Sequence, residues 1–496
     1  MALIHKATMN LNILKRIPWL AIFATVTIIF VLAIVLDHIN VPPRELSPYI
    51  ERRASGHNQF IVDFGLWMGQ TLLKLDRGEY HSHAMELTTI GAQAHALRPQ
   101  VTQGTNSNIV LVSSSAETLK AIAKARPGDV ITLMPGTYRF KGKYIEVSQA
   151  GTDTSRITLR AESPNTVYLE FHMLEGFKVS APYWTFENLH IHGACQEHGN
   201  CEHAFHIVSN AAHFIARNNT IVDFNAHFKI NAENQMFPDY GLIEGNTLTN
   251  SSVRKTDNPV APIDLVAASH WQIRDNLITD FVKAGGDRIS YGAFAKGAGS
   301  DNRIEQNIVI CEYKLQDIPG QRVGLSLGGG GSGKHYCRDE SCITEQFGSL
   351  IQSNLIASCS DDGIYINRGA STKIIHNSLI DTGGITVRFG ESSALVRGNL
   401  VDGLIRSRDG GLLHAIDNLD TSAWRLYLGI HPVRNLYVNA ASLVFTWNDT
   451  PPGQNIREGS SQDLCGVLRS PHPIYGAFED FSACLIAKHG QNYFQP

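Results

Sequence analysis

The chain of 496 residues is 43% hydrophobic and 18% charged, so it is long and apolar enough to bury a large core. Its formal net charge is only -4, which gives no reason to expect nucleic acid as a partner. The chain also holds 43 glycines, as expected of a protein with many tight turns.

Residues 19–36 form an apolar run, WLAIFATVTIIFVLAIVL, that is long enough to cross a bilayer as a helix. Lys6, Lys15 and Arg16 precede the run, whereas only Arg44 follows closely, so we expect a cytoplasmic N-terminus. A cleaved signal peptide is the alternative, but the run exceeds the usual length of about 7–15 residues and no A-x-A-like site follows. Residues 1–40 are therefore predicted to be a cytoplasmic tip and membrane anchor, with the rest periplasmic or extracellular.

Residues 41–110 are predicted to form a partly helical stalk, because the stretch FIVDFGLWMGQTLLKLDRGE is amphipathic at a helical period. The next stretch, SAETLKAIAKARPGDVITLMPGTYRF, predicts a short helix, a PGD turn, a strand and a PGT turn. Such a helix would cap the first coil of a repeating β structure, whose open end needs protection from edge pairing.

Short runs of β-branched and aliphatic residues recur around an Asn through most of the remaining chain. The gaps of 17 to 47 residues between them are typical of a solenoid, and the Val, Ile, Thr and Gly content favours several short strands per coil. An Asn at one corner can bond the backbone of its own turn and the Asn of the next coil. We therefore predict an all-β parallel β-helix over residues 111–440, with residues 441–496 as a C-terminal cap or tail. The predicted ladder is Asn188, Asn219, Asn246, Asn276, Asn307, Asn354, Asn377, Asn399, Asn418 and Asn435.

The eight cysteines suggest disulfides in an oxidising compartment. Three pairs are close in sequence, and Cys311 and Cys359 follow the ladder Asn of adjacent coils, which makes them neighbours. Zinc is the alternative for the first pair, because four histidines surround it. The local pairs are Cys195 with Cys201, Cys337 with Cys342 and Cys465 with Cys484, and the histidines are His192, His198, His203 and His206.

The phrases PGDVITLMPGTYR and SRITLRAES resemble the opening coils of the chondroitinase B-like and alginate lyase-like polysaccharide lyases. This resemblance implies a right-handed β-helix and a lyase that cleaves an acidic polysaccharide. Together with the predicted anchor, it predicts a membrane-anchored enzyme outside the cytoplasm. The later segment NRGASTKIIHNSLIDTGGITVRFG resembles the family segment in which a Lys acts as base and an Arg contacts the substrate, with calcium held by an Asn and two Glu. The matching positions are Arg368 for the Lys, Arg388 for the Arg and Asn367 for the Asn, while the acidic pair matches only Asp361 and then Gly363.

The strands themselves predict where the site lies. When AFHIV, FKINA, IDLVA, AFAKG, LSLGG, IYINR and ITVRF are stacked with alternate residues inward, two outward columns result. Lys296 and Arg388 fall three coils apart in one column, roughly 14 Å, a span that suits an oligosaccharide. The first column is His206, Lys229, Asp264, Phe294, Ser326, Tyr365 and Thr386, and the second contains Asn231, Val266, Lys296, Gly328, Asn367 and Arg388.

β-Elimination of a uronate chain requires a cation that neutralises the carboxylate and a base that removes the neighbouring proton. We expect Arg388 to be the carboxylate clamp, Lys296 or Tyr365 the base, and Arg368 to serve in either role. Asp264 and Asp361 are the candidate ligands of a calcium ion. The expected substrate-binding residues are Lys229, Asn231, His206, Asn367 and Ser326.

Two other functions stay open from the sequence. One is a non-catalytic glycan-binding or surface-assembly β-helix, and the other is an epimerase of uronate polymers, although no DPHD-like motif is present. The run GGGGSGKH at residues 328–335 lacks the Ser or Thr of a phosphate-binding loop and is expected to be an insertion held by Cys337 and Cys342. The sequence predicts no oligomeric state.

Overall fold

The computed structural model describes residues 23, 27, 31, 33–38, 40–78, 88–92, 108–329, 333–454 and 462–485. The chain divides into two compact units: residues 1–76 with 422–430, and residues 77–421 with 431–496. Among the described residues, no helix has both the length and the apolar character needed to cross a membrane. Most of the predicted anchor, residues 19–36, lies outside the described residues.

The first unit contains a helical hairpin. Helix α2 spans Pro43–Ala54, and α3 spans Gln59–Arg77, which covers most of the amphipathic stretch predicted to be helical. The helices meet at Gly65, where a Cβ atom would lie 2.3 Å from that of Ala54. A fully buried ion pair between Arg44 and Asp76, 2.6 Å apart, joins the two helices. The short helix α5, Ala423–Tyr427, belongs to the same unit.

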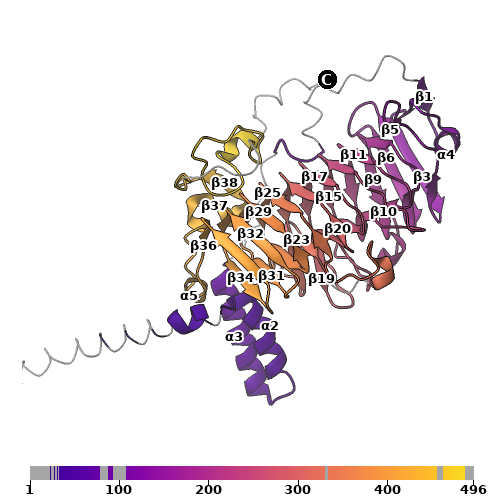
Figure 1. Cartoon of the computed structure of the whole chain (residues 1–496). Helices are drawn as coiled ribbons and strands as arrows, with labels where there is room; N and C mark the ends of the chain where they lie inside the picture. Colours follow the sequence, from indigo (N-terminus) through magenta and orange to yellow (C-terminus); the bar gives the residue numbers. More distant parts are fainter. Residues whose placement is uncertain are drawn as a thin grey trace, which may run out of the picture. The chain divides into compact units, whose positions relative to one another are not determined.

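The second unit is a right-handed parallel β-helix, as predicted, with its strands stacked along one axis in Figure 1. Its first sheet has 12 strands in the order β1-β2-β5-β8-β11-β14-β17-β21-β25-β29-β32-β35. These strands are β1 Asn108–Val112, β2 Asp129–Leu133, β5 Ile157–Ala161, β8 Trp184–Glu187, β11 Ile215–Arg217, β14 Leu242–Glu244, β17 Gln272–Arg274, β21 Arg303–Glu305, β25 Leu350–Gln352, β29 Thr372–Ile375, β32 Ser393–Arg397 and β35 Leu412–Ile416.

The second sheet has 11 strands and follows the first within each coil. They are β3 Gly136–Gly142, β6 Val167–Met173, β9 His190–Gly193, β12 Thr220–Val222, β15 Thr247–Thr249, β18 Leu277–Thr279, β22 Ile308–Ile310, β26 Leu355–Ala357, β30 Ser378–Ile380, β33 Leu400–Val401 and β36 Leu419–Asp420.

The third sheet has 10 strands and completes each coil. They are β4 Ile145–Val147, β7 Glu175–Val179, β10 His203–Ile207, β13 Ala226–Ile230, β16 Ile263–Val266, β19 Ile289–Lys296, β23 Gln321–Gly328, β27 Ile364–Asn367, β31 Gly384–Arg388 and β34 Leu404–Arg408. A small sheet at a corner consists of β20 Gly299–Ser300, β24 Gln346–Phe347 and β28 Gly369–Ala370. A separate antiparallel pair consists of β37 Tyr437–Asn439 and β38 Val444–Trp447.

Inward side chains from all three sheets form one continuous core. Phe177, Phe205 and Phe228 occupy the same position in three successive coils, and their rings stack 5.3 and 5.2 Å apart. At the end of the solenoid that carries β1, the predicted cap is helix α4, Ser115–Lys124, which packs on β1 to β4. Ser114 accepts a hydrogen bond from the backbone N–H of Glu117 and so caps this helix.

The buried Asn ladder is confirmed from Asn219 to Asn418. From Asn246 on, each Asn Oδ1 accepts hydrogen bonds from the backbone and side chain of the Asn one coil earlier, as at Asn246 and Asn276, 2.9 and 3.1 Å. The Oδ1 of Asn219 accepts from the backbone N–H of Leu189 at 3.0 Å. Two predicted members are wrong. Asn188 lies one residue before the ladder position, which Leu189 occupies, and its side chain pairs with Asn218. Asn435 lies in the 3-10 turn Arg434–Leu436, outside the three sheets.

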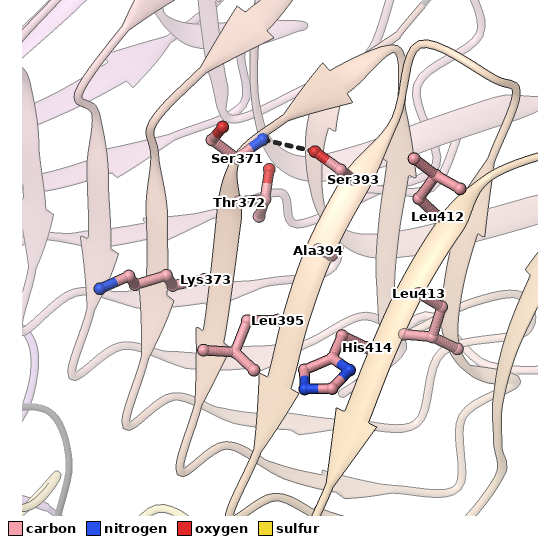
Figure 2. Close-up of a pocket in the computed structure, with 9 residues that line it drawn as sticks. All are labelled: Ser371, Thr372, Lys373, Ser393, Ala394, Leu395, Leu412, Leu413 and His414. Atoms are coloured by element: carbon pink, nitrogen blue, oxygen red, sulfur yellow. Dashed lines mark hydrogen bonds between the residues drawn. The ribbon is translucent and has the colours of Figure 1, made fainter.

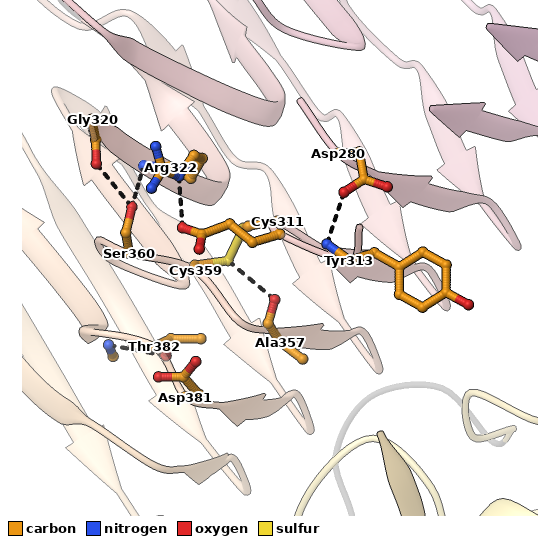
Figure 3. The surroundings of a disulfide bond; sticks show 12 residues. Asp280, Cys311, Tyr313, Gly320, Arg322, Ala357, Cys359, Ser360, Asp381 and Thr382 are labelled. Carbon is orange, nitrogen blue, oxygen red and sulfur yellow. Dashed lines mark hydrogen bonds and ion pairs between the residues drawn. A yellow bond between two sulfur atoms is a disulfide. The ribbon is translucent and has the colours of Figure 1, made fainter. Parts of the chain in front are cut away.

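All eight cysteines are paired as the sequence suggested, which rules out the zinc alternative at Cys195 and Cys201. Cys311–Cys359 joins neighbouring coils, and Figure 3 shows Arg322 beside it. Arg322 forms a buried ion pair with Glu312 at 2.7 Å, and Glu312 also binds Arg77 at 3.2 Å.

Residues 431–454 and 462–485 cover part of one side of the solenoid. Their apolar side chains, such as Tyr437 and Phe478, pack on outward residues of the 11-stranded sheet, such as Ile308 and Leu355. The disulfide Cys465–Cys484 fastens this segment, which includes the 3-10 turns Ala440–Ser442 and Phe481–Cys484. The outward face of the 11-stranded sheet is therefore covered from β18 to β36, whereas its first strands β3 and β6 keep exposed side chains such as Lys141 and Tyr168.

Candidate functional site

The two outward columns predicted on the 10-stranded sheet are present in the strand register. In the first column His206 pairs with Lys229, Lys229 with Asp264, Asp264 with Phe294, Phe294 with Ser326, Ser326 with Tyr365, and Tyr365 with Thr386. In the second, Val266 pairs with Lys296, Gly328 with Asn367, and Asn367 with Arg388. The predicted site residues thus share one face, but they fall into two groups.

The first group, which we call the cationic cluster, consists of Lys296, Tyr365, Asn367, Arg368 and Arg388. The Tyr365 hydroxyl receives hydrogen bonds from Arg388 Nη1 at 3.4 Å and from Asn367 Nδ2 at 3.3 Å. The guanidinium groups of Arg388 and Arg368 lie 4.6 and 5.7 Å from the centre of the Phe389 ring. Both guanidinium groups therefore lie near the Phe389 ring, and that of Arg388 also contacts the tyrosine hydroxyl.

Asp409, one coil beyond Arg388, accepts a hydrogen bond from Arg388 Nε at 2.5 Å. Burial alone would lower the pKa of Arg388, but its hydrogen bonds to Asp409 and Tyr365 raise it. Burial also raises the pKa of Tyr365, an effect that Arg388 only partly offsets. At neutral pH this site thus presents a permanent guanidinium cation and a protonated phenol.

Arg368 and Asn367 carry unused hydrogen-bonding capacity. The backbone of Arg368 is left-handed, with φ +59°, and its N–H donates to Ser392 Oγ at 2.7 Å. Its Nε atom and the Oδ1 atom of Asn367 are buried without a hydrogen-bond partner among the described residues. Such orphan groups are uncommon in folded proteins and often mark functional sites.

Lys296, like Arg368, has no carboxylate within ion-pair distance among the described residues, whereas Lys229 and Arg388 each have one. Its Nζ atom lies 4.7 Å from the centre of the Phe294 ring. The next position in its column is Gly328, whose φ is +74° and where a Cβ atom would lie 1.8 Å from the carbonyl oxygen of Asn367. No side chain therefore stands between Lys296 and Asn367 in this column.

The second group lies at earlier coils, and its charges are already paired. Lys229 binds Asp264 at 2.7 Å, and His206 bonds Glu175 at 3.0 Å and Asn231 at 2.8 Å. Burial would raise the pKa of Glu175, but His206 lowers it. The substrate-binding roles expected of Lys229, Asn231 and His206 would require these pairs to open.

Ser326 does not reach the surface. It is fully buried, and its hydroxyl donates to the Gly328 carbonyl at 2.9 Å. Its inclusion among the substrate-binding residues therefore finds no support, because the outward direction of a side chain does not guarantee exposure.

The predicted calcium ligands do not meet. Asp264 and Asp361 lie about three coils apart, roughly 14 Å, and Asp264 is neutralised by Lys229. Within the described part of the solenoid taken by itself, no three His, Cys, Asp or Glu side chains are close enough to share an ion. These two residues do not fit a shared calcium site.

The sequence pattern missed several neighbours of the site, namely Glu175, Glu202, His203, Tyr291 and Asp409. Glu175 could have been found by extending the register one coil back, where it pairs with His203. Burial raises the pKa of Glu202 and lowers that of His203 to about 3.

The solenoid also carries a shallow depression of about 430 Å³ on its 12-stranded sheet, on another face than the two columns (Figure 2). The exposed Leu412 and the half-buried Leu395 and Leu413 line it together with Lys373 and His414. The figure shows Lys373 and His414 on different strands without a hydrogen bond between them. The residues that line it are Ser371, Thr372, Lys373, Ser393, Ala394, Leu395, Leu412, Leu413 and His414.

Comparison with known proteins supports the fold. No curated protein sequence matches the chain. The structure is similar to pectate lyase Pel9A, with 15% identity, a TM-score of 0.52, and coverage of 76% of this chain and 98% of that one. It also matches an alginate lyase from Paenibacillus sp. str. FPU-7, with 14% identity, a TM-score of 0.33, and coverage of 64% and 96%, respectively. The polysaccharide lyase Pedsa3628 from Pseudopedobacter saltans matches with 12% identity, a TM-score of 0.32, and coverage of 63% and 93%. Residues 100–258 match the family described as Pel9A-like, right handed beta helix region, so the chain carries a β-helix similar to that of polysaccharide lyases.

Proposed function

We propose that the protein is a polysaccharide lyase that cleaves a uronate-containing polymer by β-elimination at the cationic cluster. The contact between Arg388 and the protonated Tyr365 hydroxyl carries this proposal, because it combines a fixed cation with a proton donor on an outward face. The similarity in fold to a pectate lyase supports the same class of reaction.

The roles follow from the chemistry of each group. Arg388 neutralises the carboxylate, which makes the proton on the adjacent carbon more acidic. A base removes this proton, a carbon–carbon double bond forms, and the bond to the leaving glycosidic oxygen breaks. Tyr365 is protonated and can return a proton to that oxygen. We assign the base to Lys296, which must lose its own proton before it acts. Its strand position lies roughly 14 Å from that of Arg388, so the two long side chains must turn toward each other over the bound sugar.

We further propose that the protein works outside the cytoplasm, tethered through residues 19–36. The four disulfides support an oxidising compartment. The apolar length of that run and the basic residues before it support the tether and its orientation.

The test is incubation of the purified protein with a panel of acidic polysaccharides, followed by ultraviolet absorbance and mass spectrometry of the products. A lyase gives unsaturated oligosaccharides. An epimerase would instead incorporate solvent deuterium without cleavage, and a glycan-binding protein would retain the polymer unchanged. Either outcome would refute the lyase assignment.

A further inference from the structure

The loop between β23 and β24 begins and returns beside Lys296. A Cβ atom on Gly329 would lie 3.3 Å from Lys296 Cδ, so the lysine stem runs along this glycine. The backbone N–H of Arg338 donates to the Gly297 carbonyl at 2.9 Å. Gly329 and Arg338 are thus both anchored next to the candidate base.

Arg338 fastens this loop to earlier coils. Its two terminal nitrogens each lie 2.8 Å from one oxygen of Asp239, a two-bond geometry that fixes orientation as well as distance. Nη1 also donates to Ser269 Oγ at 3.2 Å, and the guanidinium covers the Phe237 ring at 4.3 Å. The disulfide Cys337–Cys342 closes the adjoining turn. This part of the loop is therefore a fixed wall.

The wall presents a cation and an aromatic ring to solvent. Lys334, His335 and Tyr336 form the short 3-10 turn η3, Lys334–Tyr336, and all three are exposed. Tyr336 is 62% exposed, and His335 packs on its ring with centroids 3.7 Å apart. Lys334 has no ion pair among the described residues. No contact with another element among the described residues gives these three exposed side chains a structural role.

We propose that η3 is a substrate subsite that binds the carboxylate of a neighbouring sugar through Lys334 and the apolar face of its ring through Tyr336. Arg338 is the positioning residue for this turn. Because Arg338 reaches back to Asp239 and Ser269 in coils before Lys296, the subsite lies on the side of Lys296 away from Arg388. The protein would then select polymers with carboxylates on neighbouring sugars. This inference rests on the proposed function for its substrate class.

Direct binding tests the subsite without requiring turnover. Affinities for oligogalacturonate, oligoalginate and a neutral oligosaccharide of equal length are measured calorimetrically with the full chain. We expect Tyr336→Ala and Lys334→Ala each to weaken binding of an acidic oligosaccharide about fivefold to tenfold. Arg338→Ala should weaken it at least as much, because the turn loses its anchor. Tyr168→Ala and Lys141→Ala, exposed controls on the 11-stranded sheet, should bind like the wild type.

Turnover separates this inference from the proposed function. For an active lyase, Tyr336→Ala and Lys334→Ala should raise KM in the same proportion while kcat changes less than about twofold. Normal binding by both variants would overturn the subsite even if the wild type cleaves polymer. Weakened binding by both in a protein without turnover would support the subsite and refute the lyase assignment. A wild type that binds no acidic oligosaccharide would contradict both.

Discussion

At the residue scale, the tyrosine hydroxyl in the cationic cluster is the most specific element of the mechanism. Tyr365 contacts Arg388 and Asn367 through that oxygen alone, so Tyr365→Phe removes the proton donor and leaves the ring in place. We expect kcat to fall about 100-fold or more, with KM nearly unchanged. Steady-state kinetics with Tyr168→Phe as control check this, and a kcat close to that of the wild type would exclude Tyr365 as the acid.

A buried histidine makes the fold sensitive to acid. His227 is fully buried, with Nε2 3.0 Å from the Thr249 carbonyl and Nδ1 without a partner among the described residues. Burial lowers the pKa of His227 to about 4, below the unfolded value of about 6.5, so the unfolded chain binds the proton more readily. Stability should therefore fall by roughly 3 kcal/mol as the pH drops from about 6.5 to about 4.

His227→Phe removes this titration while filling a similar volume. The melting temperature of the variant, followed by circular dichroism between pH 7 and pH 4, should fall less steeply than that of the wild type. His203, whose pKa is lowered in the same way, should retain part of the slope in the variant. Identical slopes for the two proteins would show that His227 does not titrate in this window.

At the element scale, the Asn ladder ties each coil to the next. Asn276 accepts from the backbone and side chain of Asn246, and it donates to the Ile243 carbonyl and to Asn307 Oδ1. Asn276→Ala leaves several of these buried groups unpaired, so we expect a loss of about 2–4 kcal/mol of unfolding free energy. Urea unfolding measures it. Asn418→Ala, at the half-buried last rung, should cost clearly less, and equal costs would contradict the role of burial.

The sequence predicted coils and columns well because both follow from simple periods. Alternation along a strand and the near-regular Asn spacing together determine which residues share a face, as the pairing of Tyr365 with Ser326 and Thr386 illustrates. Asn188 and Asn435 carry similar local phrases, but such a phrase does not fix whether the Asn occupies the buried corner.

Partners across coils were harder to predict. The pairing of Arg388 with Asp409, and of Lys229 with Asp264, depends on side-chain rotamers and on turns of irregular length. The stack of Tyr183, His213 and Tyr240 was missed for another reason. These bulky residues lie at turns with positive φ, where a sequence reading expects Gly or Asn.

At the scale of the whole molecule, the candidate site lies on one of the three sheet faces of the solenoid. The C-terminal segment covers part of the 11-stranded sheet, whereas the 10-stranded sheet presents Lys296 and Arg388 in one column. The disulfide-closed loop stands beside Lys296. The proposed function depends on a face several coils long, along which an extended polymer would lie.

The turnover of Lys296→Ala and Arg388→Ala on the cleaved polysaccharide tests the central claim most directly. Both variants should lose at least about 100-fold in kcat/KM while keeping the melting temperature of the wild type. Arg388→Lys should recover only part of the lost kcat/KM, since an ammonium cannot make two parallel bonds to a carboxylate. Lys373→Ala and Arg139→Ala, on the other two sheets, should retain full activity. Activity that survives in both Lys296→Ala and Arg388→Ala would contradict the assignment of catalysis to this face.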